Sequence, residues 1–267
     1  MPTAPVLDAA EAARLSDLNW AEQLREQARG CGGIVVDDAG LLLTAAPVAS
    51  PFVNSATRLD PRLRPADVLA RATRFYAERG HGHVVMVHAT DDDDALAEAA
   101  LAAGYADVLN APAMVVYEPL PERPLPDGTL LRPVVSEAGV RHFTGVAAEA
   151  WTTYGLEQET VATLFSRPEA LLAPHVVAVV AQLDGRPAAC AMVILSHGIG
   201  GIYWVSSTTP TRGRGLGEAV TRAVTNRAFD LGARLVSLQA SPMGEPIYRR
   251  MGFAELFRYR MLLAPKR

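Results

Sequence analysis

The stretch Arg212-Gly213-Arg214-Gly215-Leu216-Gly217 decides how this 267-residue sequence is interpreted. It lies between a predicted strand over residues 201–207 and a predicted helix over residues 216–231. Because glycine has no Cβ atom, successive backbone amides in such a loop can approach and surround an anion. The N-terminus of the following helix adds unpaired N–H groups, and the two arginines add positive charge. The stretch therefore predicts a site for the phosphates of a small ligand.

Other phosphate-binding loops fit this stretch less well. Its glycines are spaced GxGxG, whereas dinucleotide-binding domains use GxGxxG and an acidic residue on a later strand. A Walker loop requires Gly-Lys-Ser/Thr, and the only lysine in the chain is Lys266. The remaining alternative is a surface loop that contains glycines incidentally.

A proline-rich segment separates the chain into two comparable halves. Residues 119–128 contain four prolines, which block helix and sheet hydrogen bonding, so they are predicted to form a linker. Pro133 marks the first strand after it as an edge strand, and Asp184-Gly185 predicts a hairpin turn. The second half is predicted to contain strands over 129–135, 176–181, 188–195, 201–207, 234–239 and 253–263, and helices over 137–151, 159–165, 216–231 and 245–251. This order is typical of a layered α/β domain.

The first half repeats the later part of this plan. The order helix, glycine, strand, helix, glycine, aromatic residue occurs twice, ending at Gly104-Tyr105 and at Gly252-Phe253. Such a repeat indicates a degenerate internal duplication. The first half is predicted to contain helices over 17–29, 66–78 and 95–103, and strands over 34–36, 41–43, 84–88 and 113–117.

The glycine stretch resembles the pyrophosphate loop of a known family. Arg212, Gly215 and Gly217 match the pattern Arg/Gln-x-x-Gly-x-Gly/Ala of the GCN5-related N-acetyltransferases. Residues 205–210 are similar to the family's Val-x-x-x-Pro approach, with the proline displaced by one residue, and the resemblance covers roughly residues 129–263. It implies a layered α/β domain with a mixed central sheet flanked by helices, and acetyl-CoA as co-substrate. Together with the internal repeat, it predicts two such acetyltransferase-like domains, of which the N-terminal one is degenerate. The residues that it implies for cofactor binding are Val205 and Ser207 through their backbone, Arg212, Gly213, Arg214, Gly215, Leu216, Gly217 and Ser241.

Tyr248 matches the family's Tyr-x-x-x-Gly-Phe pattern. The resemblance implies that this tyrosine protonates the thiolate of coenzyme A as it leaves, and a phenol with a pKa near ~10 can do so once positioned. The alternative is an ordinary half-buried tyrosine at a helix end. The group that accepts the proton of the attacking amine stays open, the candidates being an ordered water, Glu157, Glu159, Glu245 and His197.

Four aromatic residues are candidates to line an acceptor pocket, although aromatic residues at this density are also typical of a core. They are Trp151, Tyr154, Tyr203 and Trp204. Since Tyr203 and Trp204 are adjacent on a predicted strand, we expect them to face opposite sides of the sheet. Only one of those two would then line the pocket.

The first half lacks both functional features. In place of the glycine stretch it has residues 59–65, with no glycine and with two prolines that lack amide donors. Ala100 occupies the place of Tyr248, four residues before a glycine. We therefore predict a non-catalytic acetyltransferase-like domain over residues 1–122 and a catalytic domain over residues 128–267, an arrangement similar to that of tandem members of the family.

Composition and charge exclude several classes of protein. Residues 1–122 carry 9 basic and 18 acidic residues, so the chain as a whole is not expected to bind nucleic acid. No apolar run approaches the roughly 18 residues that cross a bilayer, and no secretion signal is recognised. Cys31 and Cys190 fit reduced thiols in a cytoplasmic protein. Four consecutive carboxylates at residues 91–94 cannot converge as calcium ligands do, and no metal site is expected.

The expected function is that of an N-acetyltransferase. It would move acetyl from acetyl-CoA to the amine of a small molecule or a peptide, by direct attack in a ternary complex. The alternative is a non-catalytic acyl-CoA-binding sensor or scaffold module. The sequence does not identify the acceptor, because acceptor sites come from variable loops. It also leaves open whether the first half contributes to the acceptor site and whether the protein forms a homodimer.

Overall fold

The structure is a computed structural model that describes residues 7–88 and 91–266. The first half contains α1 (Ala9–Gly30), β1 (Ile34–Asp38), β2 (Leu41–Ala45), η1 (Pro51–Val53), β3 (Ser55–Arg58), α2 (Pro65–Ala77), β4 (Val84–His88), α3 (Asp91–Ala102) and β5 (Ala106–Val116). The second half contains β6 (Thr129–Pro133), α4 (Glu137–Trp151), η2 (Thr152–Tyr154), α5 (Gln158–Leu164), α6 (Pro168–Leu171), β7 (Val176–Leu183), β8 (Arg186–Ser196), β9 (Ile199–Ser207), η3 (Thr209–Thr211), α7 (Leu216–Asp230), β10 (Val236–Gln239), α8 (Glu245–Met251) and β11 (Ala254–Leu263).

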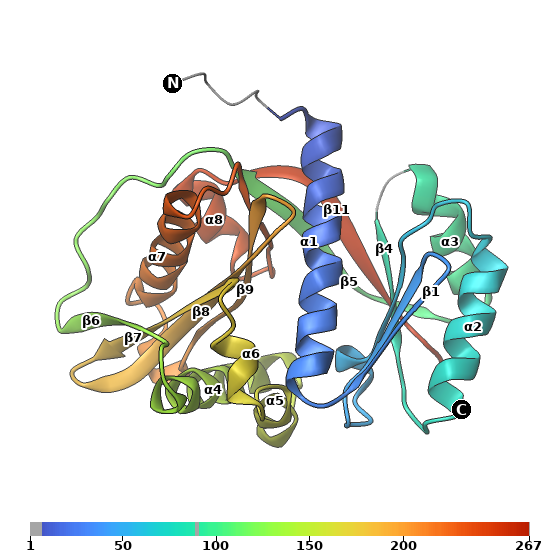
Figure 1. Ribbon diagram of the computed structural model, residues 1–267, viewed down its shortest axis with the longest axis horizontal. Coiled ribbons are helices and arrows are strands. Elements are labelled where there is room, and N and C mark those ends of the chain that lie inside the picture. Colours follow the sequence, from blue (N-terminus) through green and yellow to red (C-terminus); the bar gives the residue numbers. More distant parts are fainter. Residues whose placement is uncertain (1–6, 89–90, 267) are drawn as a thin grey trace.

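One sheet of eleven strands runs through the described part of the chain (Figure 1). Its order is β1-β2-β3-β4-β11-β5-β10-β9-β8-β7-β6. The pairs β3–β4 and β9–β10 are parallel, and the remaining pairs are antiparallel. The sheet is therefore mixed, and the expected α/β class is confirmed.

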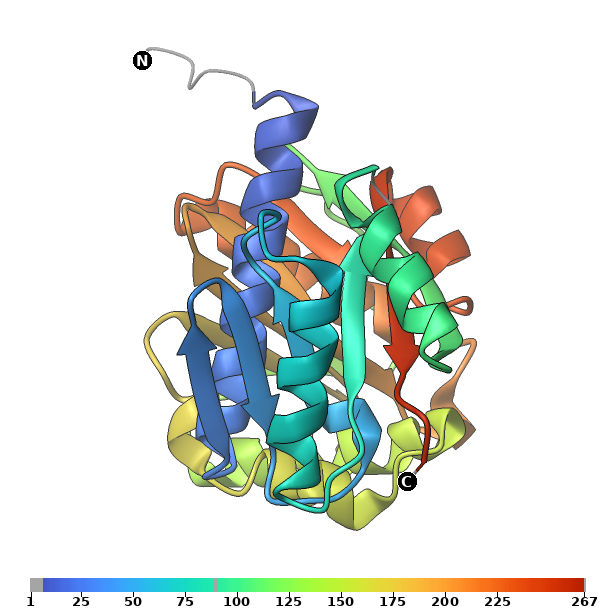
Figure 2. The same cartoon turned by 90° about the vertical axis from the view of Figure 1, so that its right-hand side faces the viewer.

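Helices cover both faces of this sheet. One face carries α2 and α3 over the first half and α7 and α8 over the second, and the other face carries α1, α4, α5 and α6 (Figures 1 and 2). Alternation along β5 shows the two layers directly, because Met114 and Val116 pack towards α7 whereas Ala113 and Val115 pack on the α1 side. The core thus lies in two layers, one on each face of the sheet.

The two halves exchange their last strands. β5, at the end of the first half, pairs with β10 of the second half, and β11, at the end of the second half, pairs with β4 of the first. The two exchanged strands also pair with each other from Ala106 to Val115 on β5. The halves therefore share a backbone hydrogen-bond ladder. The predicted division into residues 1–122 and 128–267 remains a prediction about function and ancestry.

Helix α1 lies across the seam between the halves (Figure 1). It begins at Ala9, well before the predicted start at Asp17, because Asp8 caps it by accepting the Glu11 N–H at 2.8 Å. Asn19 joins it to the second half by donating to the Ile194 carbonyl (2.9 Å) and accepting from the Tyr203 hydroxyl (2.6 Å). The first half therefore supplies part of the second half's α-helical layer.

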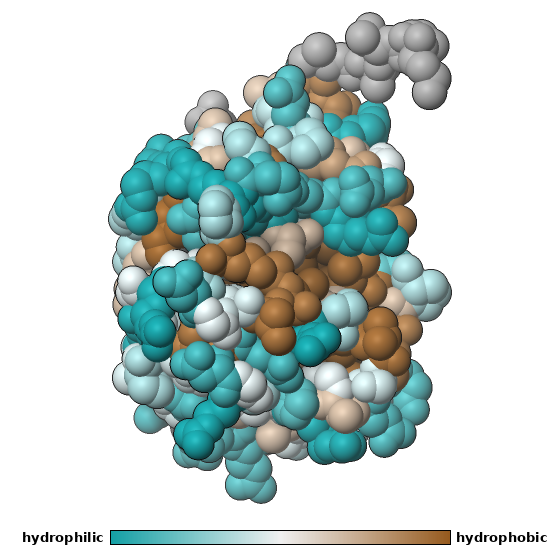
Figure 3. All heavy atoms as spheres, turned by 90° about the vertical axis from the view of Figure 1, so that its left-hand side faces the viewer, coloured by the Kyte–Doolittle hydropathy of each residue, from teal (hydrophilic) through white to brown (hydrophobic). Residues whose placement is uncertain are grey.

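The outer edge of the second half is β6. Within the described residues this strand pairs with β7 alone, which confirms the prediction from Pro133 that it is an edge strand. The β7–β8 hairpin turns at Asp184 and Gly185, both with positive φ (49° and 79°), as predicted. Figure 3 looks onto this side of the molecule, and apolar side chains gather across the middle of that face. Leu125 in the linker and Leu130 on β6 are among the exposed apolar residues of these elements.

Candidate active site

The glycine stretch forms the connection from η3 to α7. Gly213 and Gly215 have φ values of 76° and 78°, in the left-handed region that favours glycine. Gly215 is the N-cap of α7 and no side chain caps this helix, so the amides of its first turn are left for another partner. Both glycines are exposed. The predicted phosphate site thus coincides with an uncapped helix N-terminus.

Strand β9 extends beyond its parallel partner. Pairing with β10 ends at Ile202 and Leu238, and residues 203–207 continue along β8 alone. The edge of β9 that carries the backbone groups of Val205 and Ser207 is therefore not paired with β10. We call this edge, together with the β10–α8 connection that faces it, the strand opening.

A bulge interrupts β9 beside the strand opening. Trp204 has a φ of 56°, and the register with β8 shifts between Cys190 and Met192. Because the bulge adds a residue, Tyr203 and Trp204 both join the core cluster beneath α4, α5 and α6. The prediction that these two side chains face opposite sides of the sheet is wrong for this reason. Trp204 packs against Trp151 of α4, with ring centroids 4.7 Å apart.

The two arginines of the glycine stretch have different surroundings. The Arg212 guanidinium donates to Thr153 Oγ1 at 2.7 Å and to the Ala150 carbonyl at 3.3 Å. It therefore ties the stretch to the C-terminus of α4, where the helix dipole favours a cation. Arg214 is exposed and makes no hydrogen bond or ion pair with the residues that the structure describes. Of the two, Arg214 is the one whose charge is left for a ligand.

Tyr248 lies on α8, behind the strand opening. Its side chain is 8% exposed and packs edge-on against Phe253, with ring centroids 5.9 Å apart. Burial raises the pKa of the phenol well above its ordinary value, and a hydrogen bond with Thr221 acts in the opposite direction. The phenol is therefore protonated at neutral pH, which is the state that a proton donor requires.

Gly244 brings Ser241 and Tyr248 together. A Cβ placed on Gly244 would lie 2.7 Å from Tyr248 Cε2 and 3.4 Å from both Tyr248 Cζ and Ser241 Oγ, so a side chain there would displace the phenol. Ser241 Oγ accepts the Gly244 N–H at 3.2 Å and the Tyr154 hydroxyl at 3.0 Å. The structure thus gathers three hydroxyl-bearing residues at one side of the strand opening.

The end of α4 contacts the other side of the opening. Trp151 Nε1 donates to Ser206 Oγ at 3.0 Å, and Glu149 Oε1 accepts the Thr209 N–H at 3.0 Å. The sequence did not predict the contact of Ser206 with Trp151 or that of Thr153 with Arg212. Ser206 and Thr153 are common hydroxyl residues, and contacts between positions more than fifty residues apart leave no signal in local spacing.

The candidates for accepting the amine proton are dispersed. His197 lies in the β8–β9 turn, at the opposite end of β9 from the glycine stretch, and contacts Ser196 Oγ at 3.1 Å. Glu245 is engaged by Arg249 at 2.8 Å. Glu157 and Glu159 are exposed beside the start of α5. The geometry assembles none of these four with Tyr248, which favours an ordered water.

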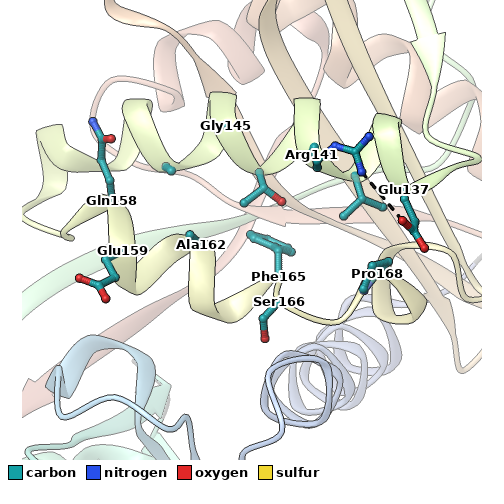
Figure 4. A pocket seen from close by; sticks show the side chains of 12 residues that line it. Glu137, Arg141, Gly145, Gln158, Glu159, Ala162, Phe165, Ser166 and Pro168 are labelled. Atoms are coloured by element: carbon teal, nitrogen blue, oxygen red, sulfur yellow. Dashed lines mark ion pairs between the residues drawn. The ribbon is translucent and has the colours of Figure 1, made fainter.

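A pocket of about 480 Å³ lies between α4 and α5, away from the glycine stretch (Figure 4). Phe165 and Ala162 contribute apolar surface to it, and Glu137 and Arg141 form an ion pair of 3.9 Å at one end. None of the residues implied for cofactor binding lines it. The pocket is therefore separate from the candidate active site.

Residues 7–88 and 91–266 show neither a membrane span nor a metal site. None of the helices there is long and apolar enough to span a membrane. No group of three or more His, Cys, Asp or Glu side chains in those residues is placed to hold a metal ion. Among the four consecutive aspartates, Asp93 pairs with Arg58, and the side chains at positions 91 and 92 lie outside the described set. Cys31 and Cys190 are buried free thiols.

Comparisons with known proteins agree with this geometry. The acetyltransferase (GNAT) family model matches residues 143–253. No curated protein matches the chain. A GCN5-related N-acetyltransferase from Kribbella flavida has a TM-score of 0.70 at 22% identity, covering 92% of this chain and 96% of that one. One from Sphaerobacter thermophilus has a TM-score of 0.63 at 19% identity, covering 85% and 76%.

A tandem GNAT protein from the clavulanic acid biosynthesis pathway also has this fold. Its TM-score is 0.58 at 15% identity, and 98% of each chain is covered. The similarity of fold therefore extends over both halves. The family match itself contains β9, the glycine stretch and Tyr248. Residues 143–253 are a domain of the acetyltransferase (GNAT) family, within a chain that has the GNAT fold along nearly its whole length.

Proposed function

We propose that residues 128–267 form an acetyl-CoA-dependent N-acetyltransferase and that residues 1–122 are a degenerate, non-catalytic domain of the same fold. The observation that carries this proposal is the unpaired edge of β9 beside the uncapped N-terminus of α7. An extended amide-containing arm such as pantetheine can pair with a free strand edge at Val205 and Ser207. A pyrophosphate fits the amides from Gly213 to Gly217, with Arg214 adding charge.

The reaction follows from these positions. The amine nitrogen attacks the thioester carbonyl carbon while a backbone N–H near Val205 polarises the carbonyl oxygen. The C–S bond then breaks, and the sulfur takes the phenolic proton of Tyr248, which leaves a neutral thiol. The amine proton passes to water. Burial of Tyr248 disfavours the charged phenolate, so solvent returns the proton and the phenol is restored.

The acceptor in this proposal is the amine of a small molecule or a peptide, and the protein acts in the cytoplasm. The acidic first half, with 18 acidic and 9 basic residues, disfavours nucleic acid as a partner. A homodimer remains a prediction. Sedimentation at two protein concentrations tests it.

Titration calorimetry with coenzyme A tests the cofactor site, and we expect one site per chain. Release of free thiol from acetyl-CoA across a panel of amines then tests turnover. Absence of coenzyme A binding would contradict the proposal. Binding without thiol release for every amine would favour the sensor or scaffold alternative.

A further inference from the structure

The end of α4 and the turn after it bridge the strand opening. We call residues 149–154 the bridging segment. On the β9 side, hydrogen bonds join it to Ser206, Thr209 and Arg212. On the opposite side, the Tyr154 hydroxyl donates to Ser241 Oγ at 3.0 Å. The segment is therefore fixed at both sides, and Tyr154 is its contact with the β10–α8 connection.

Tyr154 lies close to the place where a thioester would react. Ser241 Oγ, which accepts its hydroxyl, and Tyr248 Cζ are each 3.4 Å from the same point, the Cβ position of Gly244. In the proposed reaction Tyr248 gives its proton to the sulfur. The sulfur would then lie beside Tyr248, on the side of the strand opening where the Tyr154 hydroxyl contacts Ser241.

Tyr154 belongs to a chain of three packed aromatic rings. The ring centroids of Trp151 and Tyr154 are 5.2 Å apart, and those of Trp151 and Trp204 are 4.7 Å apart. Trp151 is held by its hydrogen bond to Ser206, and Trp204 is 8% exposed at the bulge. Rings held in this way resist an added acyl chain, because overpacking displaces side chains from their rotamers.

We propose that Tyr154 limits the length of the acyl group, so that acetyl and propionyl thioesters of coenzyme A are accepted and longer chains are rejected. This inference rests on the proposed function, because it assumes that the thioester lies in the strand opening. The donor substrates would be short-chain thioesters of coenzyme A. Specificity for the acyl group would then depend on a residue outside the glycine stretch.

The test is calorimetric and needs no acceptor. Acetyl-, propionyl-, butyryl- and hexanoyl-CoA are titrated into the wild-type protein and into Tyr154→Ala and Tyr154→Phe. We expect hexanoyl-CoA to bind the wild type about 30-fold more weakly than acetyl-CoA, within the range that overpacking produces. Tyr154→Ala should reduce this ratio to about 3-fold or less, whereas Tyr154→Phe, which keeps the ring, should preserve most of it.

The matched control is Tyr117→Ala. Tyr117 and Tyr154 are equally exposed, at 42%, but Tyr117 follows β5 beside Asp8, near the N-terminus of α1. This variant should discriminate between acyl groups as the wild type does. Thermal unfolding of each variant checks that it is folded.

Three results would overturn the inference. Equal affinity of the wild type for all four thioesters would do so while leaving the proposed function intact, and so would unchanged discrimination in a folded Tyr154→Ala variant. Failure of the wild type to bind coenzyme A or any thioester would overturn the proposed function and this inference with it.

Discussion

The parallel pairs β3–β4 and β9–β10 hold equivalent places in the two halves of the sheet, but their ends are built differently. In the second half, β9 runs past β10 and leaves a backbone edge unpaired. In the first half, one carboxylate joins both strand ends. Asp93 accepts from the Arg58 guanidinium at the end of β3 and from the His88 N–H at the end of β4, the latter at 2.9 Å. The strand order creates two equivalent positions, and the groups at the strand ends decide which one stays open.

The loops that follow β3 and β9 also differ in polarity. After β9, glycines and the uncapped start of α7 present amide donors, which suit an anion. After β3, the carbonyl oxygens of Pro61 and Leu63 accept from Arg58 at 3.3 Å and 3.2 Å. The Arg58 guanidinium therefore donates to the free carbonyl oxygens of the first loop, whereas the free amides of the second loop are suited to an external phosphate. In the first half, a buried ion pair between Arg58 and Asp93 thus occupies the position that is open in the second half.

Removing that ion pair should have the largest effect on stability. Arg58→Met leaves the Asp93 carboxylate buried without its charged partner, because these side chains are only 4% and 9% exposed. We expect a loss of about 3–5 kcal/mol in the free energy of unfolding, measured by urea denaturation. The control Arg62→Met removes an exposed pair with Asp60 and should leave the free energy of unfolding nearly unchanged. Equal stability of the two variants would contradict the view that the buried Arg58–Asp93 pair holds the strand ends of the first half together.

Local signals explain what the sequence predicted well. Asp184-Gly185 gave the β7–β8 hairpin because both positions need positive φ. Gly252 ends α8 in the left-handed conformation, as its place in the pattern indicated. The fold class and the family followed from the glycine stretch and its surroundings. The positions of Arg212 to Gly217 and Tyr248 follow from the same resemblance, while their roles are proposals.

Long-range pairing explains what the sequence did not predict. The exchange of β5 and β11 depends on which edges are free after both halves fold, and no local pattern carries that information. β3 was missed because Ser55–Arg58 is short and mostly polar, without clear alternation. The bulge at Trp204 was missed because no glycine marks it. The contact between Tyr154 and Ser241 spans 87 positions, beyond any motif.

The next largest effect is expected at the proton donor. Tyr248→Phe keeps the buried ring but removes the phenolic proton. We expect turnover to fall about 100-fold, the lower part of the range for general acids, while coenzyme A affinity stays within about 2-fold. Thiol-release kinetics and calorimetry on the same preparation check both quantities. If affinity falls as far as turnover, Tyr248 acts in binding or packing, and the second half resembles its degenerate counterpart more than we propose.

A proline can remove an amide donor from the glycine stretch. In the corresponding loop of the first half, residues 59–65, prolines already occupy two of the seven positions. Gly217 lies in the first turn of α7, where proline is tolerated but has no N–H to give a phosphate. Gly217→Pro should weaken coenzyme A binding about 30-fold, as expected for losing a hydrogen bond to a charged group. The matched variant Gly217→Ala keeps the N–H, and its Cβ would be 3.5 Å from Ser207 Oγ, an ordinary contact. Equal affinity of the two variants would exclude this amide from the phosphate site.

The smallest expected effect is on the pH dependence of stability, and it comes from Asp17. This residue of α1 contacts His88 at the end of β4. Asp17 accepts from the Tyr259 hydroxyl at 2.6 Å and lies 3.2 Å from His88 Nε2. Burial raises the pKa of Asp17 to about 6 from an ordinary 3.8, although His88 and Tyr259 act in the opposite direction. Between these two pH values the folded state holds more protons than the unfolded state. The contribution of this carboxyl to stability therefore decreases as pH rises from about 4 to about 6.

Asp17→Asn removes this titration. The difference in unfolding free energy between the wild type and Asp17→Asn should therefore fall by about 1 kcal/mol between pH 4 and pH 7. The full shift would give about 3 kcal/mol, and we reduce it because the side chain is 28% exposed. Urea denaturation of both proteins at four pH values measures the difference. A difference that stays constant would mean that water solvates Asp17, and one that grows with pH would mean that His88 and Tyr259 stabilise its carboxylate more than burial destabilises it. Either result would mean that burial does not dominate at the ends of β3 and β4. The contrast with the strand opening would then depend on the Arg58–Asp93 ion pair alone.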